Sequence, residues 1–201
     1  MERLWKRYGA YLIGLAVAVV IGFAGWKYWD AQRVEERHAE GERFSAAAAL
    51  LQQGKTEEAG ALFAALAGET DSGYGMLARF NGAAIRARAD DPAGAVQIYD
   101  AIAADESAPR SLRDLATVLS GLQALRVPSV DLSALEGKLL ALTRGGSAFR
   151  HMAFEILALA AQSAGDVEKA KQNYKAIVDD AEAPQGIRSR ASQMLAILDG
   201  A

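Results

Sequence analysis

Few side chains in this sequence could carry out chemistry, and the two histidines come first. The chain has no cysteine and so no thiolate metal site, and neither His38 nor His151 has a second likely ligand at helical spacing. His38 lies beside Glu36, Arg37 and Glu40, a pattern typical of a solvated helix surface. His151 follows Arg150 near a predicted helix start. We therefore predict no metal site.

The glycine-rich segment Thr143–Ser147 and the carboxylate pairs favour structural roles. The segment lacks the Gly-Lys-Ser/Thr ending of a phosphate-binding loop and follows no predicted strand, so we expect an inter-helix turn. Glu57-Glu58 and Asp90-Asp91 lie where helix N-termini are predicted, which suits negative charge. Asp179-Asp180 lies near a helix C-terminus and is expected only to be exposed. We predict no enzyme activity, no cofactor and no small-molecule substrate.

Composition limits the fold class. From Asp30 to Ala201 the chain has 18 basic and 24 acidic residues, a balance that argues against nucleic-acid binding. Alanine is abundant, prolines number four, and β-branched runs occur only near the N-terminus. These features predict an all-α fold.

A stretch of nineteen uncharged residues, Tyr8–Trp26, is the strongest signal in the sequence. A helix of that length crosses about 30 Å of hydrocarbon, so we predict a single transmembrane helix in contact with membrane lipid. A cleaved signal peptide and a buried core helix are the alternatives. The stretch is too long for the first, and its aromatic ends do not suit the second. The aromatics at those ends are Trp5, Tyr8, Tyr11, Trp26, Tyr28 and Trp29.

The basic residues before this stretch predict its orientation. Arg3, Lys6 and Arg7 precede it, whereas acidic residues dilute the basic residues beyond it. This bias places the N-terminus in the cytoplasm. We therefore divide the chain into a cytoplasmic stub with a membrane anchor, residues 1–29, and a translocated domain, residues 30–201.

Small residues recur every fourth position in the predicted anchor. Lipid does not drive apolar helices together, so close approach through small side chains is how membrane helices associate. We expect this ridge to dock against a partner's membrane helix or a second copy of the chain, and chance composition is the alternative. The ridge consists of Ala10, Gly14, Ala18 and Gly22.

The translocated part contains a repeated apolar triplet. The offsets between successive copies are 36, 40 and 35 residues, which is the spacing of helical-repeat proteins. A turn precedes each copy, and a partner helix with its own apolar stripe lies upstream; two such stripes are Leu115-Val118-Leu119-Leu122 and Phe154-Leu157-Ala158-Ala161. We predict an α-solenoid of about four helical hairpins and a capping helix near Gln185–Leu198. The triplets are Ala59-Phe63-Leu66, Ala95-Tyr99-Ile102, Leu135-Leu139-Leu142 and Ala170-Tyr174-Ile177.

The segment from Gly165-Asp166 to Pro184 resembles the second helix of a tetratricopeptide repeat, although its proline lies two positions late. The chain is also similar to the YfgM-like family, in the span that ends Gly25-Trp26-Lys27-Tyr28-Trp29 and in Tyr74-Gly75-Met76-Leu77-Ala78 at a hairpin start. That family comprises ancillary subunits of the bacterial SecYEG translocon, grouped with a cell-division coordinator. The resemblance implies an inner-membrane protein whose periplasmic repeats contact translocon subunits, a periplasmic chaperone and translocating clients.

The repeat resemblance also implies a partner-binding groove, because the first helix of each tetratricopeptide pair faces the concave side. A solvated helix flank is the alternative for each residue. Three functional hypotheses follow: a membrane-anchored scaffold, a structural or cell-division subunit acting mainly through its membrane helix, and an enzyme with a diffuse site, which no constellation supports. The groove candidates are Arg79, Arg86, Arg113, Gln123, Met152, Glu155 and Gln162.

Overall fold

The computed structural model describes the backbone of residues 2–144 and 146–200 and the side chains of residues 22, 23, 26–144 and 146–200. Over these residues the chain forms nine α-helices, and their bounds follow the predicted hairpins. They are α1 (Glu2–Gln52), α2 (Thr56–Glu69), α3 (Gly73–Arg88), α4 (Pro92–Ala104), α5 (Arg110–Ala124), α6 (Leu132–Arg144), α7 (Arg150–Ser163), α8 (Val167–Val178) and α9 (Gln185–Asp199).

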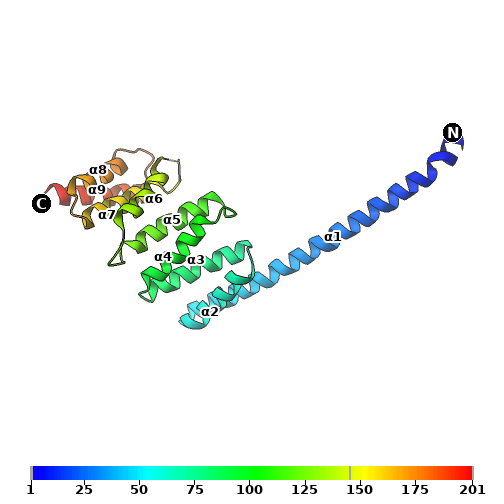
Figure 1. The fold of residues 1–201 in the computed structure, drawn as a ribbon, viewed down its shortest axis with the longest axis horizontal. Helices are drawn as coiled ribbons and strands as arrows, with labels where there is room; N and C mark the ends of the chain where they lie inside the picture. Colours follow the sequence, from blue (N-terminus) through cyan, green and yellow to red (C-terminus); the bar gives the residue numbers. More distant parts are fainter. Residues whose placement is uncertain (1, 145, 201) are drawn as a thin grey trace.

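Consecutive helices pack side by side into a solenoid from which α1 projects (Figure 1). The hairpins are α1–α2, α3–α4, α5–α6 and α7–α8, and α9 packs against the last of them. This arrangement confirms the predicted all-α solenoid with a C-terminal helix added to the array.

The repeated triplets form the core of the solenoid, as predicted. All of their members are buried, and Phe63, Ile102, Leu139 and Tyr174 are among the largest side chains with less than 2% exposure. Large residues on each second helix therefore fill the space beside the next hairpin. Burying such a side chain contributes about 1.5–3 kcal/mol.

Three hairpins turn through the same backbone conformation. Gly54, Asp90 and Gly165 have φ values of 78°, 60° and 77°, a left-handed region that favours glycine. The next residue then precedes the second helix, and Asp91 and Asp166 accept hydrogen bonds from backbone N–H groups of that helix. The predicted turns at these positions are confirmed.

One predicted stripe is only partly right. On α5 the sequence pattern predicts that Leu115, Val118, Leu119 and Leu122 face inward, but Leu122 is 43% exposed, and of the four only Val118 is fully buried. The rest of the buried face of α5 consists of Ala116, Ser120, Gly121 and Ala124. Small residues occupy this face because neighbouring helices approach closely: a Cβ atom on Gly121 would lie 3.3 Å from side-chain atoms of Leu135 and Leu139.

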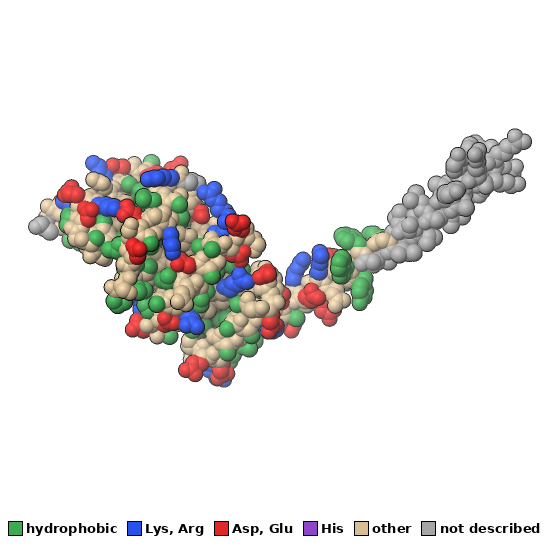
Figure 2. Space-filling view, in the orientation of Figure 1, with side chains coloured by type: hydrophobic (Ala, Val, Ile, Leu, Met, Phe, Trp, Pro, Cys, Tyr) green, Lys and Arg blue, Asp and Glu red, His purple; other side chains and the backbone are tan. Residues whose placement is uncertain are grey.

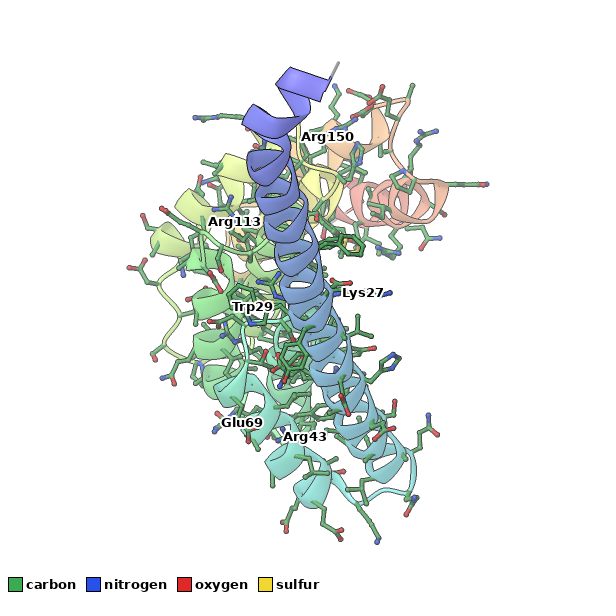
Figure 3. The ribbon with its side chains drawn as sticks, turned by 90° about the vertical axis from the view of Figure 1, so that its right-hand side faces the viewer. Lys27, Trp29, Arg43, Glu69, Arg113 and Arg150 are labelled. Atoms are coloured by element: carbon green, nitrogen blue, oxygen red, sulfur yellow. The ribbon has the colours of Figure 1, made fainter. Side chains whose placement is uncertain are left out.

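Helix α1 joins the predicted anchor to the first hairpin without a break. Its C-terminal part packs through Phe44, Ala47, Ala48 and Leu51, one apolar stripe at helical spacing. Arg43 is paired with Glu69 of α2 (Figure 3). Residues 26–39 are exposed on every side, so they form a stalk between the solenoid and the N-terminal part of α1.

The predicted transmembrane helix is not supported by the described side chains. No helix among them is both long enough and apolar enough to cross a membrane. The stretch Tyr8–Trp26 lies almost entirely outside these residues, as do Ala10, Gly14 and Ala18 of the ridge. Gly22 is described and exposed. The anchor therefore remains a prediction.

Candidate functional site

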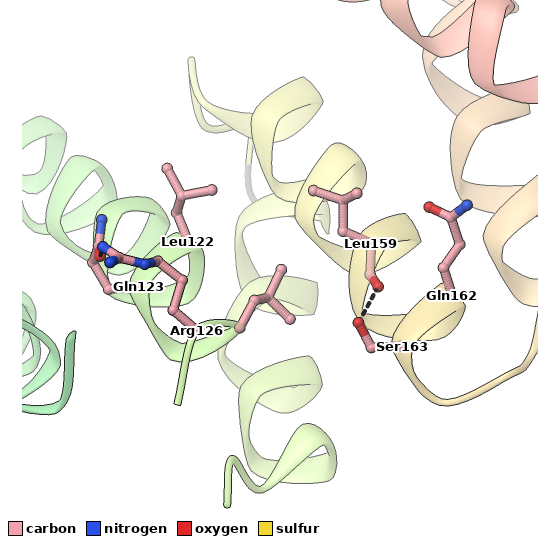
Figure 4. A pocket seen from close by; sticks show the side chains of 7 residues that line it. Leu122, Gln123, Arg126, Leu159, Gln162 and Ser163 are labelled. Carbon is pink, nitrogen blue, oxygen red and sulfur yellow. Dashed lines mark hydrogen bonds between the residues drawn. The ribbon is translucent and has the colours of Figure 1, made fainter. Parts of the chain in front are cut away.

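A groove lies between the first helices of the third and fourth hairpins. We call it the α5–α7 groove (Figure 4). It is shallow and open to solvent, with a volume of about 750 Å³. Its lining comprises Leu122, Gln123, Leu125, Arg126, Leu159, Gln162 and Ser163.

The groove has an apolar floor and a polar rim. Leu122 of α5 and Leu159 of α7 face the same open space, and Gln123 and Gln162 flank them on either side (Figure 4). Leu122 is available because the small residues of α5 have taken the buried face. An exposed leucine beside a half-buried one, rimmed by polar groups, is a surface suited to binding another molecule.

Internal hydrogen bonds hold the rim side chains. Arg126 donates to the Ala87 carbonyl at 3.0 Å, to Gln123 Oε1 at 2.9 Å and to Asp90 Oδ1 at 2.8 Å. The Tyr174 hydroxyl donates to Gln162 Oε1 at 3.0 Å. Both glutamines are therefore oriented before any partner binds.

Two of the predicted groove residues, Gln123 and Gln162, lie in the α5–α7 groove. Arg79 and Arg86 instead line a second groove of about 500 Å³, formed by α2, α3 and Ile98 of α4. The structure thus divides among separate surfaces a set that the sequence places on one concave face. Sequence reasoning missed Leu122, Leu159 and Arg126. The only available signal for Leu122 was the excess of apolar residues on α5.

Both arginines of the second groove already have carboxylate partners. Arg79 contacts Asp105 at 3.1 Å and Asp71 at 2.9 Å, and Arg86 contacts Asp91 at 2.9 Å. Their guanidinium groups therefore contribute to the connections between helices. A partner would have to compete with these intrachain pairs.

The other three candidates lie outside both grooves. Glu155 receives two hydrogen bonds from Arg190 of α9, at 2.8 and 2.9 Å. Met152 packs against the apolar core shared by the third and fourth hairpins. Arg113 has a buried Nε atom without a hydrogen-bond partner.

A polar cluster that sequence reasoning missed surrounds Asp180. The buried ring of His151 lies with Nε2 2.8 Å from Asp180 Oδ2, and Arg150 donates to the same oxygen at 3.0 and 3.2 Å. The His151 bond, the backbone N–H of Glu182 and Arg150, in that order, hold the pKa of the Asp180 carboxyl well below its usual range. The cluster fixes the start of α7 to the turn after α8.

The same turn occurs two hairpins earlier, after α4. Asp105 Oδ1 accepts from the backbone of Ser107, as Asp180 Oδ1 accepts from Glu182, and a buried alanine and a proline follow in both turns. Ser107 and Arg79 lower the pKa of Asp105, with Ser107 the larger cause. The repeated Asp-x-x-Ala-Pro pattern was visible in the sequence and could have indicated a shared structural role for these aspartates.

No group of three or more potential metal-binding side chains comes together among the described residues. The described chemistry is that of a surface with pre-oriented amides and leucines. Such a surface can bind but has no nucleophile paired with a base.

Comparison with known proteins identifies the family of the repeats. No curated protein and no solved structure matches the chain. The family model for the tetratricopeptide repeat-like domain matches residues 2–127, which is more than half of the chain and covers α1 to α5. Domains of this kind are generally non-catalytic and typically bind proteins. The chain belongs to the tetratricopeptide repeat-like domain family.

Proposed function

We propose that this protein is a single-pass membrane scaffold whose repeat domain lies outside the cytoplasm and binds other proteins. The repeat family supports the protein-binding part of the proposal. The remaining parts depend on the N-terminal half of α1 and on the resemblance to the YfgM-like family.

One observation carries the membrane proposal. Phe23, just before the stalk, and Trp26, Tyr28 and Trp29 at its start are 60–72% exposed, away from the solenoid core. Arg33 lies over the Trp29 ring at 5.4 Å, and Figure 2 shows an apolar group on α1 next to the undescribed residues. Such side chains are typical of a membrane–water interface, and they lie at the end of the uncharged stretch.

The basic residues Arg3, Lys6 and Arg7 favour a cytoplasmic N-terminus. With the YfgM-like resemblance, this supports the proposal of a bacterial inner-membrane protein with periplasmic repeats. We propose that the protein is an ancillary translocon subunit that links the Sec machinery to periplasmic chaperones. The alternative is a cell-envelope or cell-division subunit that acts mainly through its membrane helix.

A fusion experiment tests the topology. A reporter that is active only outside the cytoplasm, fused after Ala201, should be active. Activity of a cytoplasmic reporter alone at the same position would reverse the topology and remove the translocon proposal.

Substitutions in the ridge separate the scaffold from its alternative. Gly14→Leu with Gly22→Leu keeps the span apolar but removes close approach, and a Cβ atom on Gly22 meets no described atom within 4 Å. Ala16→Leu with Ala24→Leu is the matched control on the opposite face. If the ridge holds a membrane partner, only the glycine pair should abolish co-purification in detergent. Full retention would show that the ridge is an accident of composition.

A further inference from the structure

We propose that the second groove is a pairing surface for a second copy of this chain, in which α2 of each copy lies in the groove of the other. The proposal rests on the membrane anchoring in the proposed function and adds an assembly state to it. It depends on how this groove differs from its counterparts along the solenoid, on the charges at one end of it and on the direction of α2.

Three grooves along the solenoid share one plan, since each lies between two consecutive second helices and over the first helix between them. The second groove lies between α2 and α4 and has a volume of about 500 Å³. The groove between α4 and α6 measures about 320 Å³, and the one between α6 and α8 about 160 Å³. The space between second helices thus increases toward the first hairpin.

Ion pairs cross the two narrower grooves. Lys138 of α6 lies 2.7 Å from Asp100 of α4. Lys169 of α8 lies 2.6 Å from Glu136 of α6. Each pair links the second helices on either side, so each of these grooves is spanned by a bond within the chain.

The second groove has no such crossing pair between α2 and α4 among the described residues. Small or apolar residues take each of the four corresponding positions, and Ile85 of α3 lines the groove beneath them. The groove is therefore both open and apolar, a surface suited to contact with another protein. The correspondences, counted from the first residue of each triplet, are Ile98 for Lys138, Ala64 for Asp100, Gly94 for Lys169 and Gly60 for Glu136.

The outward face of α2 has the shape and polarity to enter such a groove. No charged residue occurs from Ala59 to Gly68, whereas Glu168 and Lys175 are exposed on α8. Small side chains allow two helices to approach closely. Because this face adjoins the groove on the same chain, one two-fold axis beside α2 would cover both surfaces of both copies at once. The small exposed residues of this face are Ala61, Ala64, Ala65 and Gly68.

Charges at one end of the groove are complementary across such a pair. A Cβ atom on Gly60 would lie 3.8 Å from Ile85, so the start of α2 and the end of α3 are neighbours. Glu57 lies there on the groove side of α2 by helical period, is exposed, and has no ion-pair partner among the described residues. Arg86 lines the groove at the same end, and its pair with Asp91 is solvent-exposed and therefore weak. A second α2 that enters the groove in the same direction brings its Glu57 to Arg86.

The direction of α2 agrees with two copies in one membrane. Helix α2 runs back along α1, because Glu69 at its end pairs with Arg43 of α1 (Figure 1). Since α1 continues into the predicted anchor, two copies in one membrane have parallel α1 helices and stalks of equal length. A two-fold axis along the membrane normal then brings the two α2 helices together in parallel and at the same height. An antiparallel pair would require anchors in two facing membranes.

Disulfide crosslinking of the full chain in its membrane tests the proposal, and the absence of native cysteine makes each single-cysteine variant unambiguous. Ala64→Cys faces the two-fold axis and should give a disulfide-linked dimer on oxidation with copper phenanthroline. Leu62→Cys is the matched control, because Leu62 is also exposed but lies about 160° away around α2. It should remain monomeric under the same conditions.

Charge reversal tests the register of the pairing. In the Ala64→Cys background, Glu57→Arg places like charges together at both symmetric contacts, so the linked fraction should fall about fivefold. Arg86→Glu should give a similar loss, and the two reversals combined should restore linking. Glu58→Arg, on a different face of α2, is the matched control and should leave linking unchanged. Circular dichroism checks that each variant is folded.

The proposal is overturned if Ala64→Cys stays monomeric in the membrane, if Leu62→Cys links equally well, or if the combined reversal does not restore linking. A photocrosslinker at Ala64 that captures a different protein instead of a second copy would also overturn it. Each of these results leaves the membrane scaffold intact. Recovery of the chain outside the membrane fraction would instead disprove the proposed anchoring and, with it, the parallel pairing.

Discussion

The third and fourth hairpins share one pattern but are stabilised differently. In the fourth, α7 and α8 pack closely, and the buried Tyr174 reaches across to Gln162 of the partner helix. In the third, Leu139 takes the corresponding place, and α6 contacts α7 more extensively than it contacts α5. An aliphatic triplet thus keeps a helix in the array but does not keep it close to its own partner.

The turns that follow the two hairpins also differ in the hydrogen bonds that they make. The fourth ends in the Asp180 turn, which bonds back to His151 and Arg150 of its own first helix. The third ends at Gly146, with φ of 66°, and Ser147, which accepts the backbone N–H groups of Phe149 and Arg150 close by in the chain. The α5–α7 groove opens where these two hairpins meet. The groove therefore lies beside the less extensively bonded hairpin.

The largest expected effect comes from truncating the two core residues. Tyr174→Ala should lower the free energy of unfolding by about 4 kcal/mol, and Leu139→Ala by about 3 kcal/mol, because each leaves a cavity in a packed core. Urea unfolding of the full chain followed by circular dichroism measures both. Tyr174→Phe, which loses only the bond to Gln162, should cost about 1 kcal/mol. Equal costs for Tyr174→Ala and Tyr174→Phe would show that the ring is not part of the core.

Asp180→Asn should lower the melting temperature, by less than either core truncation, because the amide cannot replace the carboxylate between His151 and Arg150. The folded pKa of Asp180 is depressed, so its contribution is complete above the unfolded value of about 3.9 and is lost as pH falls below it. The difference in melting temperature between the variant and the parent chain should be constant from pH 5 to 7 and should become smaller below about pH 4. Asp179→Asn is the adjacent control. An identical pH profile for that variant would show that the bonds of Asp180 to His151 and Arg150 do not stabilise the fold.

Gly121→Ala tests the close approach in the third hairpin. The added Cβ would lie 3.3 Å from the ends of Leu135 and Leu139, so these side chains must move. We expect a loss of about 1 kcal/mol in the free energy of unfolding, the lower end for overpacked cores. A gain in stability would mean that α6 can move away freely.

The smallest effect is a gain. Gly137 lies inside α6, and a Cβ atom there meets nothing within 4 Å. Gly137→Ala should therefore stabilise the third hairpin by about 0.5–1 kcal/mol through reduced backbone entropy in the unfolded chain. The same unfolding measurement, with Gly121→Ala as its paired opposite, checks this. A loss would indicate contacts beyond those described.

Much of the fold follows from local sequence. The triplets repeat at a spacing that only stacked hairpins satisfy, and Gly54 and Gly165 mark turns by their backbone freedom. The face of α5 was harder to predict, because leucines at helical spacing compete with small residues for the interior. The close approach to Leu135 and Leu139 decided in favour of Gly121, and only the packed structure contains that information.

The candidate site was less predictable. Gln123 and Gln162 could be selected as polar residues of first helices, but their oxygens are oriented by Arg126 and Tyr174, which are known only from contacts. Arg79 resembles a free cation in the sequence and pairs with Asp105, which is 26 residues away. Asp180 meets His151 across 29 residues. Such pairs depend on how hairpins stack, which local patterns do not specify.

The number of residues in the stalk, residues 26–39, determines the direction in which the solenoid faces. Since α1 is one helix from the predicted anchor to the first hairpin, each inserted residue turns everything beyond it by about 100° and moves it by about 1.5 Å. One alanine added after Gln32 would rotate the α5–α7 groove about the axis of α1, so that it faces different neighbours. Seven added residues would nearly restore its original direction and would move it about 10 Å farther from the predicted anchor. The length of the stalk thus sets both the distance of the groove from the predicted anchor and its rotation about the axis of α1.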